Sequence, residues 1–259
     1  MPGSSPFDVL PFWSVFLLTV LLILLAGDSG YRFGLYRRSR IEDEKEAPVG
    51  AMVSATLALL AFMLAITFSL AATRFDARRS LVLEEANSVG TTYLRAAMLP
   101  ERGPEIRALL REYLDIRIAV SQARLEFAEG RRRSEDIQNQ LWGHATAVAT
   151  AHPDSIVAGL FVQTLNELID LHSMRLAALR ARIPLPIWAV MGSLAFVGFV
   201  SMGYSTGLSR TRRSPAAIAV AFCFALVLVL IVDLDRPYEG LLRTSQQALI
   251  DARQGMTEP

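Results

Sequence analysis

Four long stretches of the 259-residue chain contain no Asp, Glu, Lys or Arg. They are Val9–Gly27, Val49–Thr73, Ile183–Ser209 and Ser214–Val232, with 19, 25, 27 and 19 residues. A helix that crosses a bilayer needs roughly 17–25 mainly apolar residues. The pattern therefore predicts four transmembrane helices, and it argues against a soluble enzyme of this length.

The polar segment between the second and third stretches shows apolar positions at helical spacing and no alternation with period two. We expect one helix from Pro104 to about Gly130, a second with Ser134 as its N-cap that ends near His152, and a third capped by Asp154. The buried stripe expected in the third helix is Leu165, Leu168, Ile169, Leu171, Leu176 and Leu179. His172 is expected on the side of this amphipathic helix.

The predicted fold is an all-α membrane protein, with an extramembrane helical bundle inserted between spans 2 and 3. Residues 1–73 form transmembrane helices 1 and 2 with their connecting loop, and residues 74–182 form the bundle. Residues 183–232 form transmembrane helices 3 and 4, and residues 233–259 form a polar C-terminal tail.

The second span continues as a predicted helix beyond its apolar part, because no proline lies between Pro48 and Pro100. About fifty residues at 1.5 Å each give roughly 75 Å, whereas the hydrocarbon layer is only about 30 Å thick. Part of this helix would then stand in water, with Ala86, Val89 and Leu94 packed against the bundle. The alternative is a break near Gly90, since glycine weakens a helix interior.

Small residues recur along one face of the second span. They are Ser54, Ala58, Ala61, Ala65, Ser69 and Ala72, at an average spacing of 3.6 residues. Such a face allows helices to pack closely within a bundle. Copies of the helix from several subunits could instead surround an axis and form a neck that gates by dewetting. The neck would be lined by this face or by the neighbouring edge of Phe62, Ile66 and Leu70.

Charge and motifs exclude several function classes. The formal net charge is only +1, which gives no field to attract nucleic acid. The single cysteine rules out a disulfide scaffold. No phosphate-binding loop, nucleophile elbow or metalloprotease motif is present, and the three histidines lack metal-ligand spacing. We therefore expect no enzymatic activity, no metal and no cofactor.

Short motifs near the membrane boundaries resemble those of a known family. Phe75-Asp76-Ala77-Arg78-Arg79 follows the second span, Arg180-Ala181-Arg182-Ile183-Pro184 leads into the third, and Asp233-Leu234-Asp235-Arg236-Pro237 closes the fourth. From about Val49 to Asp251 the chain resembles the bacterial bestrophin-like family of four-span membrane proteins. At greater distance it is similar to the bestrophin anion channels.

The resemblance implies a homo-oligomeric, pentameric channel for small anions in the bacterial inner membrane, with the second span lining the pore. In the register of the family's motif, the neck positions are Ala61, Ala65 and Ser69, all small, and Phe62, Ile66 and Leu70 form the other candidate edge. Candidate vestibule or interface residues are Arg74, Asp76, Glu84, Glu85, Asn87, Asp233 and Asp235. Asp233, Asp235 and Glu239 are too few for a calcium clasp.

Two questions stay open at this stage. The chain could be a non-conducting membrane scaffold or sensor whose central helices bind a partner. Its orientation is also undecided, because Arg32, Arg37 and Arg38 after the first span place that loop in the cytoplasm by the positive-inside rule. The bestrophin-like orientation is the reverse.

Overall fold

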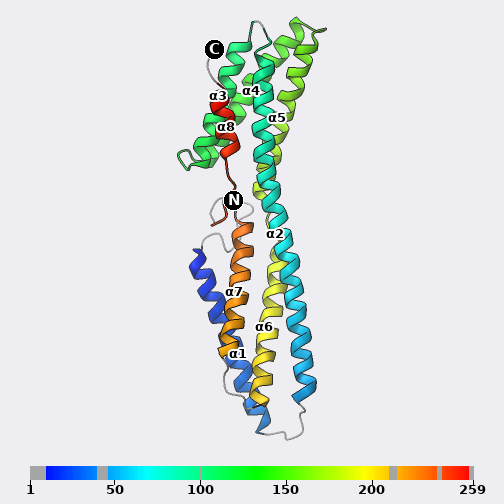
Figure 1. The fold of residues 1–259 in the computed structure, drawn as a ribbon, viewed down its shortest axis with the longest axis vertical. Coiled ribbons are helices and arrows are strands. Elements are labelled where there is room, and N and C mark those ends of the chain that lie inside the picture. The colour runs from blue at the N-terminus through cyan, green and yellow to red at the C-terminus, as the bar shows by residue number, and fades with distance from the viewer. Residues whose placement is uncertain (1–9, 40–45, 100, 210–214, 238–240, 257–259) are drawn as a thin grey trace. The chain divides into compact units, whose positions relative to one another are not determined.

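The computed structural model describes residues 10–39, 46–99, 101–209, 215–237 and 241–256. Over these residues it contains eight helices and no strand, which confirms the all-helical class (Figure 1). The chain divides into two compact units. Unit 1 comprises Met1–Phe75 and Ala181–Arg243, and unit 2 comprises Asp76–Arg180 and Thr244–Pro259. The C-terminal tail is thus shared between the two units.

Unit 1 contains the four apolar helices that the charge pattern predicts. They are α1 (Phe12–Arg38), the first half of α2 (Glu46–Ala96), α6 (Leu185–Leu208) and α7 (Pro215–Asp235). Four helices of the described chain are long and apolar enough to cross a membrane, with mean hydropathies of 2.0, 2.3, 1.9 and 2.9 in chain order. Their shared core includes Leu60 and Ala71 of α2, Met191 of α6 and Ile231 of α7.

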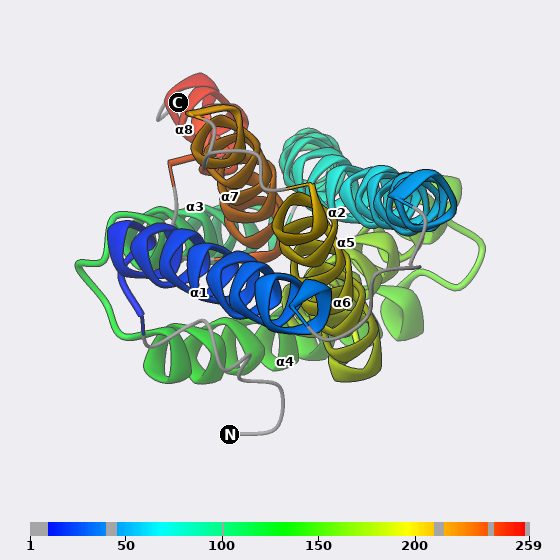
Figure 2. The same ribbon diagram turned by 90° about the horizontal axis from the view of Figure 1, so that it is seen from below.

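Helices α1 and α6 lie side by side, as both ribbon views show (Figures 1 and 2). Glycines of both helices lie where the helices cross, so no side chain separates the two backbones there. A Cβ atom added to Gly203 would lie 2.0 Å from the carbonyl oxygen of Gly27, and one added to Gly30 would lie 2.0 Å from that of Val200. Small residues that let backbones approach are a usual means of holding membrane helices together.

Helix α2 is unbroken over 51 residues (Figure 1), about 75 Å at 1.5 Å per residue. It passes through Gly90 without interruption, so the alternative of a break there is wrong. A Cβ atom at Gly90 would meet nothing within 4 Å, which means that no close packing requires a glycine at this position. Ala86 and Val89 are buried in the core of unit 2 as expected, but Leu94 is 65% exposed, contrary to expectation.

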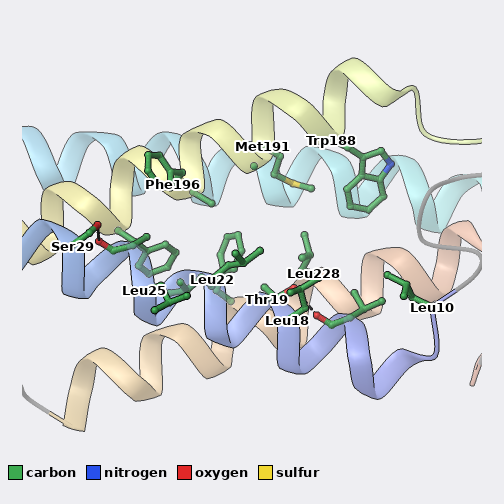
Figure 3. A pocket seen from close by; sticks show the side chains of 17 residues that line it. Leu10, Leu18, Thr19, Leu22, Leu25, Ser29, Trp188, Met191, Phe196 and Leu228 are labelled. Atoms are coloured by element: carbon green, nitrogen blue, oxygen red, sulfur yellow. Dashed lines mark hydrogen bonds between the residues drawn. The ribbon is translucent and has the colours of Figure 1, made fainter.

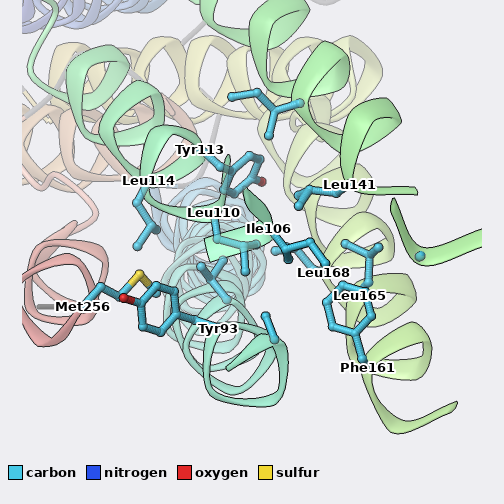
Figure 4. Close-up of a cluster of buried hydrophobic side chains, with 14 of the residues drawn as sticks. Tyr93, Ile106, Leu110, Tyr113, Leu114, Leu141, Phe161, Leu165, Leu168 and Met256 are labelled. Carbon is cyan, nitrogen blue, oxygen red and sulfur yellow. The ribbon is translucent and has the colours of Figure 1, made fainter. Parts of the chain in front are cut away.

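Unit 2 packs the second half of α2 with α3 (Gly103–Ser121), α4 (Phe127–Ala151), α5 (Ile156–Arg180) and α8 (Gln247–Gly255). Figure 4 shows its core, where Tyr93 of α2 lies beside Met256, and Ile106 and Leu110 of α3 lie near Leu168 of α5. The fully buried residues include Ile106, Leu110, Tyr113, Leu114, Leu141, Phe161, Leu165, Leu168 and Leu249. The core therefore draws on every helix of this unit.

The boundary between α3 and α4 differs from the prediction. Helix α3 ends at Ser121 and not near residue 130, because Ala123 takes a left-handed conformation with φ 54°. Ser134 is an interior residue of α4 and not an N-cap; its buried hydroxyl donates to the carbonyl oxygen of Gly130 at 2.8 Å. The chain turns here so that α4 packs on α3, with Gly130 against Val120. No proline or glycine marks the turn itself.

Helix α5 also begins later than expected. Its first turn is capped by Ser155, whose hydroxyl oxygen accepts a hydrogen bond from the backbone N–H of Ala158 at 3.2 Å, and not by Asp154. The end of α4 near His152 is confirmed. Leu165 and Leu168 are fully buried, whereas the other members of the predicted stripe are only partly buried. His172 lies in the core and not on the helix side.

The glycine contact between α1 and α6 generates a stability prediction. The change Gly203→Ala places a Cβ atom against backbone that cannot move independently, so we expect a loss of at least about 1–3 kcal/mol. The melting temperature of the purified protein in detergent should fall by several degrees. Gly192→Ala in the same helix is the matched control, because its Cβ atom would meet nothing within 4 Å. Equal melting temperatures for the two variants would contradict the assigned contact.

Candidate functional site

The predicted pore-lining residues lie on the face of α2 that its own subunit leaves uncovered. Phe62 is 61% exposed and Ile66 is 48% exposed, and the small residues Ala61, Ala65 and Ser69 are exposed as well. Leu70, at the margin of this face, is half-buried. The structure thus brings all six candidates to one side of one helix.

The opposite face of α2 makes the contacts within unit 1. Leu60, Thr67 and Ala71 are buried, and Leu57 approaches the position of Gly198 on α6. On the small-residue face, Ser54, Ala58, Ala61, Ala65 and Ser69 are exposed, whereas Ala72 is half-buried and packs against the core of unit 1. Packing within unit 1 therefore accounts for Ala72 but not for the other five small residues.

The exposed face continues along the second half of α2. Asp76, Glu84 and Asn87 are exposed, and so are Leu83 and Leu94. At 100° per residue Asp76, Leu83, Asn87 and Leu94 lie within about 40° of Ala65 around the helix, and Glu84 lies at the angle of Ile66. We call the whole set from Ser54 to Leu94 the α2 stripe. The stripe is apolar and uncharged up to Thr73 and mixed in character after it.

Glu85, predicted as a vestibule residue, lies on the other side of α2 and is fully buried. Its carboxylate accepts a hydrogen bond from the hydroxyl of Tyr113 at 2.5 Å and from the guanidinium of Arg175, and Arg117 pairs with it at 3.3 Å. The Nδ1 atom of His172 lies 3.1 Å from the Tyr113 hydroxyl. Glu85 therefore belongs to the core of unit 2 and is not exposed to a vestibule.

Burial and the two arginines shift the pKa values of this network, which lies outside the four uncharged stretches. Burial by itself raises the pKa of Glu85, but the charges of Arg117 and Arg175 outweigh it and lower the value to about 2. Burial, followed by the charge of Arg117, lowers the pKa of His172 to about 4. Burial and the neighbouring carboxylate raise the pKa of Tyr113 well above its usual value. At neutral pH the carboxylate is thus charged and the imidazole neutral.

The remaining charged candidates form a second buried group, at one end of unit 1. Asp235 accepts a hydrogen bond from the backbone N–H of Ile183 at 3.0 Å and pairs with Arg74 at 3.8 Å and Arg182 at 3.7 Å. Asp233 accepts from two backbone N–H groups, those of Leu241 and Leu242, at 2.8 and 2.9 Å. These contacts join the starts and ends of the apolar helices. Glu239 lies outside the described residues.

Sequence reasoning missed the partners of Glu85, namely Tyr113, Arg117, His172 and Arg175. The sequence signal for this buried network was Tyr113 and Arg117, which lie four residues apart on the otherwise apolar stripe of α3. Across the described ranges, no group of three His, Cys, Asp or Glu side chains is placed to hold a metal ion.

The buried histidine generates a prediction on pH dependence. The folded state lowers the pKa of His172 to about 4. The contribution of the neutral imidazole to folding stability is therefore complete above pH 6.5 and is lost as the pH falls toward 4. The free energy of unfolding should fall by at most about 3 kcal/mol over this interval. The melting temperature in detergent should fall over this interval, and His172→Gln should remove part of that slope. The exposed His152→Gln is the control and should retain it; an unchanged slope in His172→Gln would contradict the assignment.

Comparisons with known proteins place the chain in a family. A single-site variant of a bacterial bestrophin homologue from Klebsiella pneumoniae is similar in structure, with a TM-score of 0.67 and 15% identity over 95% of this chain and 97% of that one. A zinc-phased structure of the Klebsiella pneumoniae homologue gives a TM-score of 0.64 and 15% identity, over 94% and 99% of the two chains. A search of curated proteins found no match. Since residues 12–249 match the Bestrophin-like domain, this integral membrane protein belongs to the bestrophin-like family.

Proposed function

We propose that the protein is the subunit of a homo-oligomeric ion channel, pentameric and anion-conducting, in which α2 lines the pore. It resides in the bacterial inner membrane. The family supports a channel over an enzyme. The observation from the structure that carries the proposal is the α2 stripe, a continuous exposed face on the longest helix of the chain.

The stripe suits a neck between copies of α2. Small side chains at Ala61, Ala65 and Ser69 permit close approach of neighbouring helices, and Phe62 and Ile66 beside them supply apolar side chains at the same depth. A narrow apolar ring of this kind gates by dewetting, without a ring of charges. The second half of the stripe, with Asp76, Glu84 and Asn87, would form the wall of a water-filled vestibule.

Anion preference comes from the family resemblance and not from the charges of the stripe. Asp76, Arg79 and Glu84 are all exposed on it, and Arg79 lies at the same helical angle as Ala61. This part of the helix therefore carries two negative charges and one positive charge. Selectivity for anions would then depend on the neck radius and on helix-end dipoles. The test of the proposal therefore measures the fluxes of both chloride and potassium.

The first test is ion flux. Purified protein in liposomes should dissipate a chloride gradient faster than a potassium gradient. Phe62→Ala should increase the chloride flux several-fold, because it widens the apolar neck. The matched control is Leu21→Ala, which shortens an exposed side chain on α1. A potassium flux faster than the chloride flux would contradict the anion preference but not the channel function. A monomeric protein that passes neither ion would contradict the channel function itself.

A second test uses the accessibility of α2 to a charged thiol reagent. The native Cys223 is exposed and must first be replaced by serine. In that background, modification of Ala65→Cys or Ile66→Cys should block flux, and the stronger block identifies which edge of the stripe lines the neck. Leu64→Cys is the control, because Leu64 packs against the core of unit 1. Equal block at Leu64 would contradict the assignment of the stripe to the pore.

The scaffold alternative has one observation in its favour. Unit 2 exposes several large apolar side chains, among them Leu83, Leu94, Met98 and Ile156, which a bound partner would cover. Contacts between subunits account for these residues equally well. The flux measurement separates the two functions, since a scaffold in liposomes passes no ions.

A further inference from the structure

An apolar cavity lies within unit 1, between α1, α6 and α7 (Figure 3). Its volume is about 430 Å³. The floor consists of buried side chains, including Trp188, Met191 and Ile23, and the rim consists of exposed ones, including Leu22, Leu25 and Phe196. The cavity is therefore a groove that opens on the outer surface of the helices.

The groove follows from the glycine packing of α1 and α6. The close backbone contacts end near Gly27, where a Cβ atom would be 3.9 Å from the nearest oxygen. Beyond this point the side chains of Ile23, Trp188 and Met191 stand between the two helices. Large side chains hold helices further apart than glycines do, so space remains between them toward the Val15 end.

The lining is chemically uniform. None of the lining residues is charged. The two lining hydroxyls are satisfied within their own helix: Thr19 donates to the carbonyl oxygen of Val15 at 2.8 Å, and Ser29 donates to that of Ala26 at 2.7 Å. With no charged side chain in its lining and with both hydroxyls satisfied, the groove fits an apolar occupant.

The length and narrowness of the groove indicate which apolar occupant fits it. The lining residues run from Val15 to Ser29 along α1, about 21 Å at 1.5 Å per residue. A volume of about 430 Å³ along that length makes a long, narrow groove. Such a groove suits an extended hydrocarbon chain.

Charge at one end of the groove gives the occupant a direction. Leu10 lines that end, and its carbonyl oxygen accepts a hydrogen bond from Arg236 at 2.7 Å. The Arg236 guanidinium also lies 4.3 Å from the ring centre of Phe12. Charged residues such as Arg236 mark the end of the spans, at headgroup level, and the apolar groove extends from there toward the middle of the bilayer.

We propose that this groove between α1, α6 and α7 is a binding site for one acyl chain of a membrane phospholipid, with the headgroup at the Leu10 end. The site is separate from the α2 stripe, and the proposal does not depend on whether the protein conducts ions. It assigns to α1 and α7 a role in holding lipid, beyond packing against α6.

The experiment uses Trp188 as a reporter, because it is the only one of the three tryptophans that lines the groove. With Trp13 and Trp142 replaced by phenylalanine, the protein is reconstituted in phosphatidylcholine vesicles whose lipid carries bromine midway along one acyl chain. Trp188 is only 8% exposed, yet its fluorescence should fall by more than half relative to unbrominated vesicles. Absence of quenching would overturn the proposal.

Two variants test whether the quencher sits in the groove. Gly192→Leu places a side chain in the open space of the lining, and Thr19→Leu narrows the groove from α1 should the first variant fail to fold. Each should at least halve the quenching, whereas the matched control Gly143→Leu in α4 should leave it unchanged. Quenching that persists in both groove variants would overturn the site. Quenching by a brominated free fatty acid alone, and not by the phospholipid, would overturn the phospholipid as the occupant.

Discussion

The structure depends on the division of α2 into two faces along its whole length. A helix satisfies its own backbone hydrogen bonds, so it can cross the hydrocarbon layer and continue beyond it without a change of conformation. One face of α2 packs in the core of unit 1 through Leu60 and Ala71, and in the core of unit 2 through Val89 and Tyr93. The opposite face has no contact of this kind, and it is this free face that a pore requires.

Charged residues next to the apolar helices are held by arginines, and each group has a structural explanation. Glu85 has two arginine partners and a tyrosine in the core of unit 2, and Asp235 has two arginine partners where α6 begins and α7 ends. A buried carboxylate without such partners would cost several kcal/mol. The acidic residues left on the α2 stripe, Asp76 and Glu84, are therefore the ones available to contact water or ions.

The contact between α1 and α6 has consequences at both of its ends. At the glycines the backbones touch, and this close approach fixes the crossing of the two helices. Toward Val15 and Trp188 the same pair of helices separates and leaves an apolar groove. Tight packing and open space thus arise from one pattern of small and large residues along two helices.

The sequence by itself determined the four apolar helices and the all-helical class and favoured a continuous α2, because hydrophobic stretches, helical spacing and the absence of proline are local properties of the chain. The structure then excluded the break near Gly90. It also identified the face of α2 that carries Ala61, Ala65 and Ser69. Only the tertiary structure decided that this face is exposed, that the turn falls at Ala123, and that Glu85 meets Tyr113, Arg117 and Arg175. Those outcomes depend on which helices pack together, and partners 28 to 90 residues apart in the chain leave no local pattern from which they can be recognised.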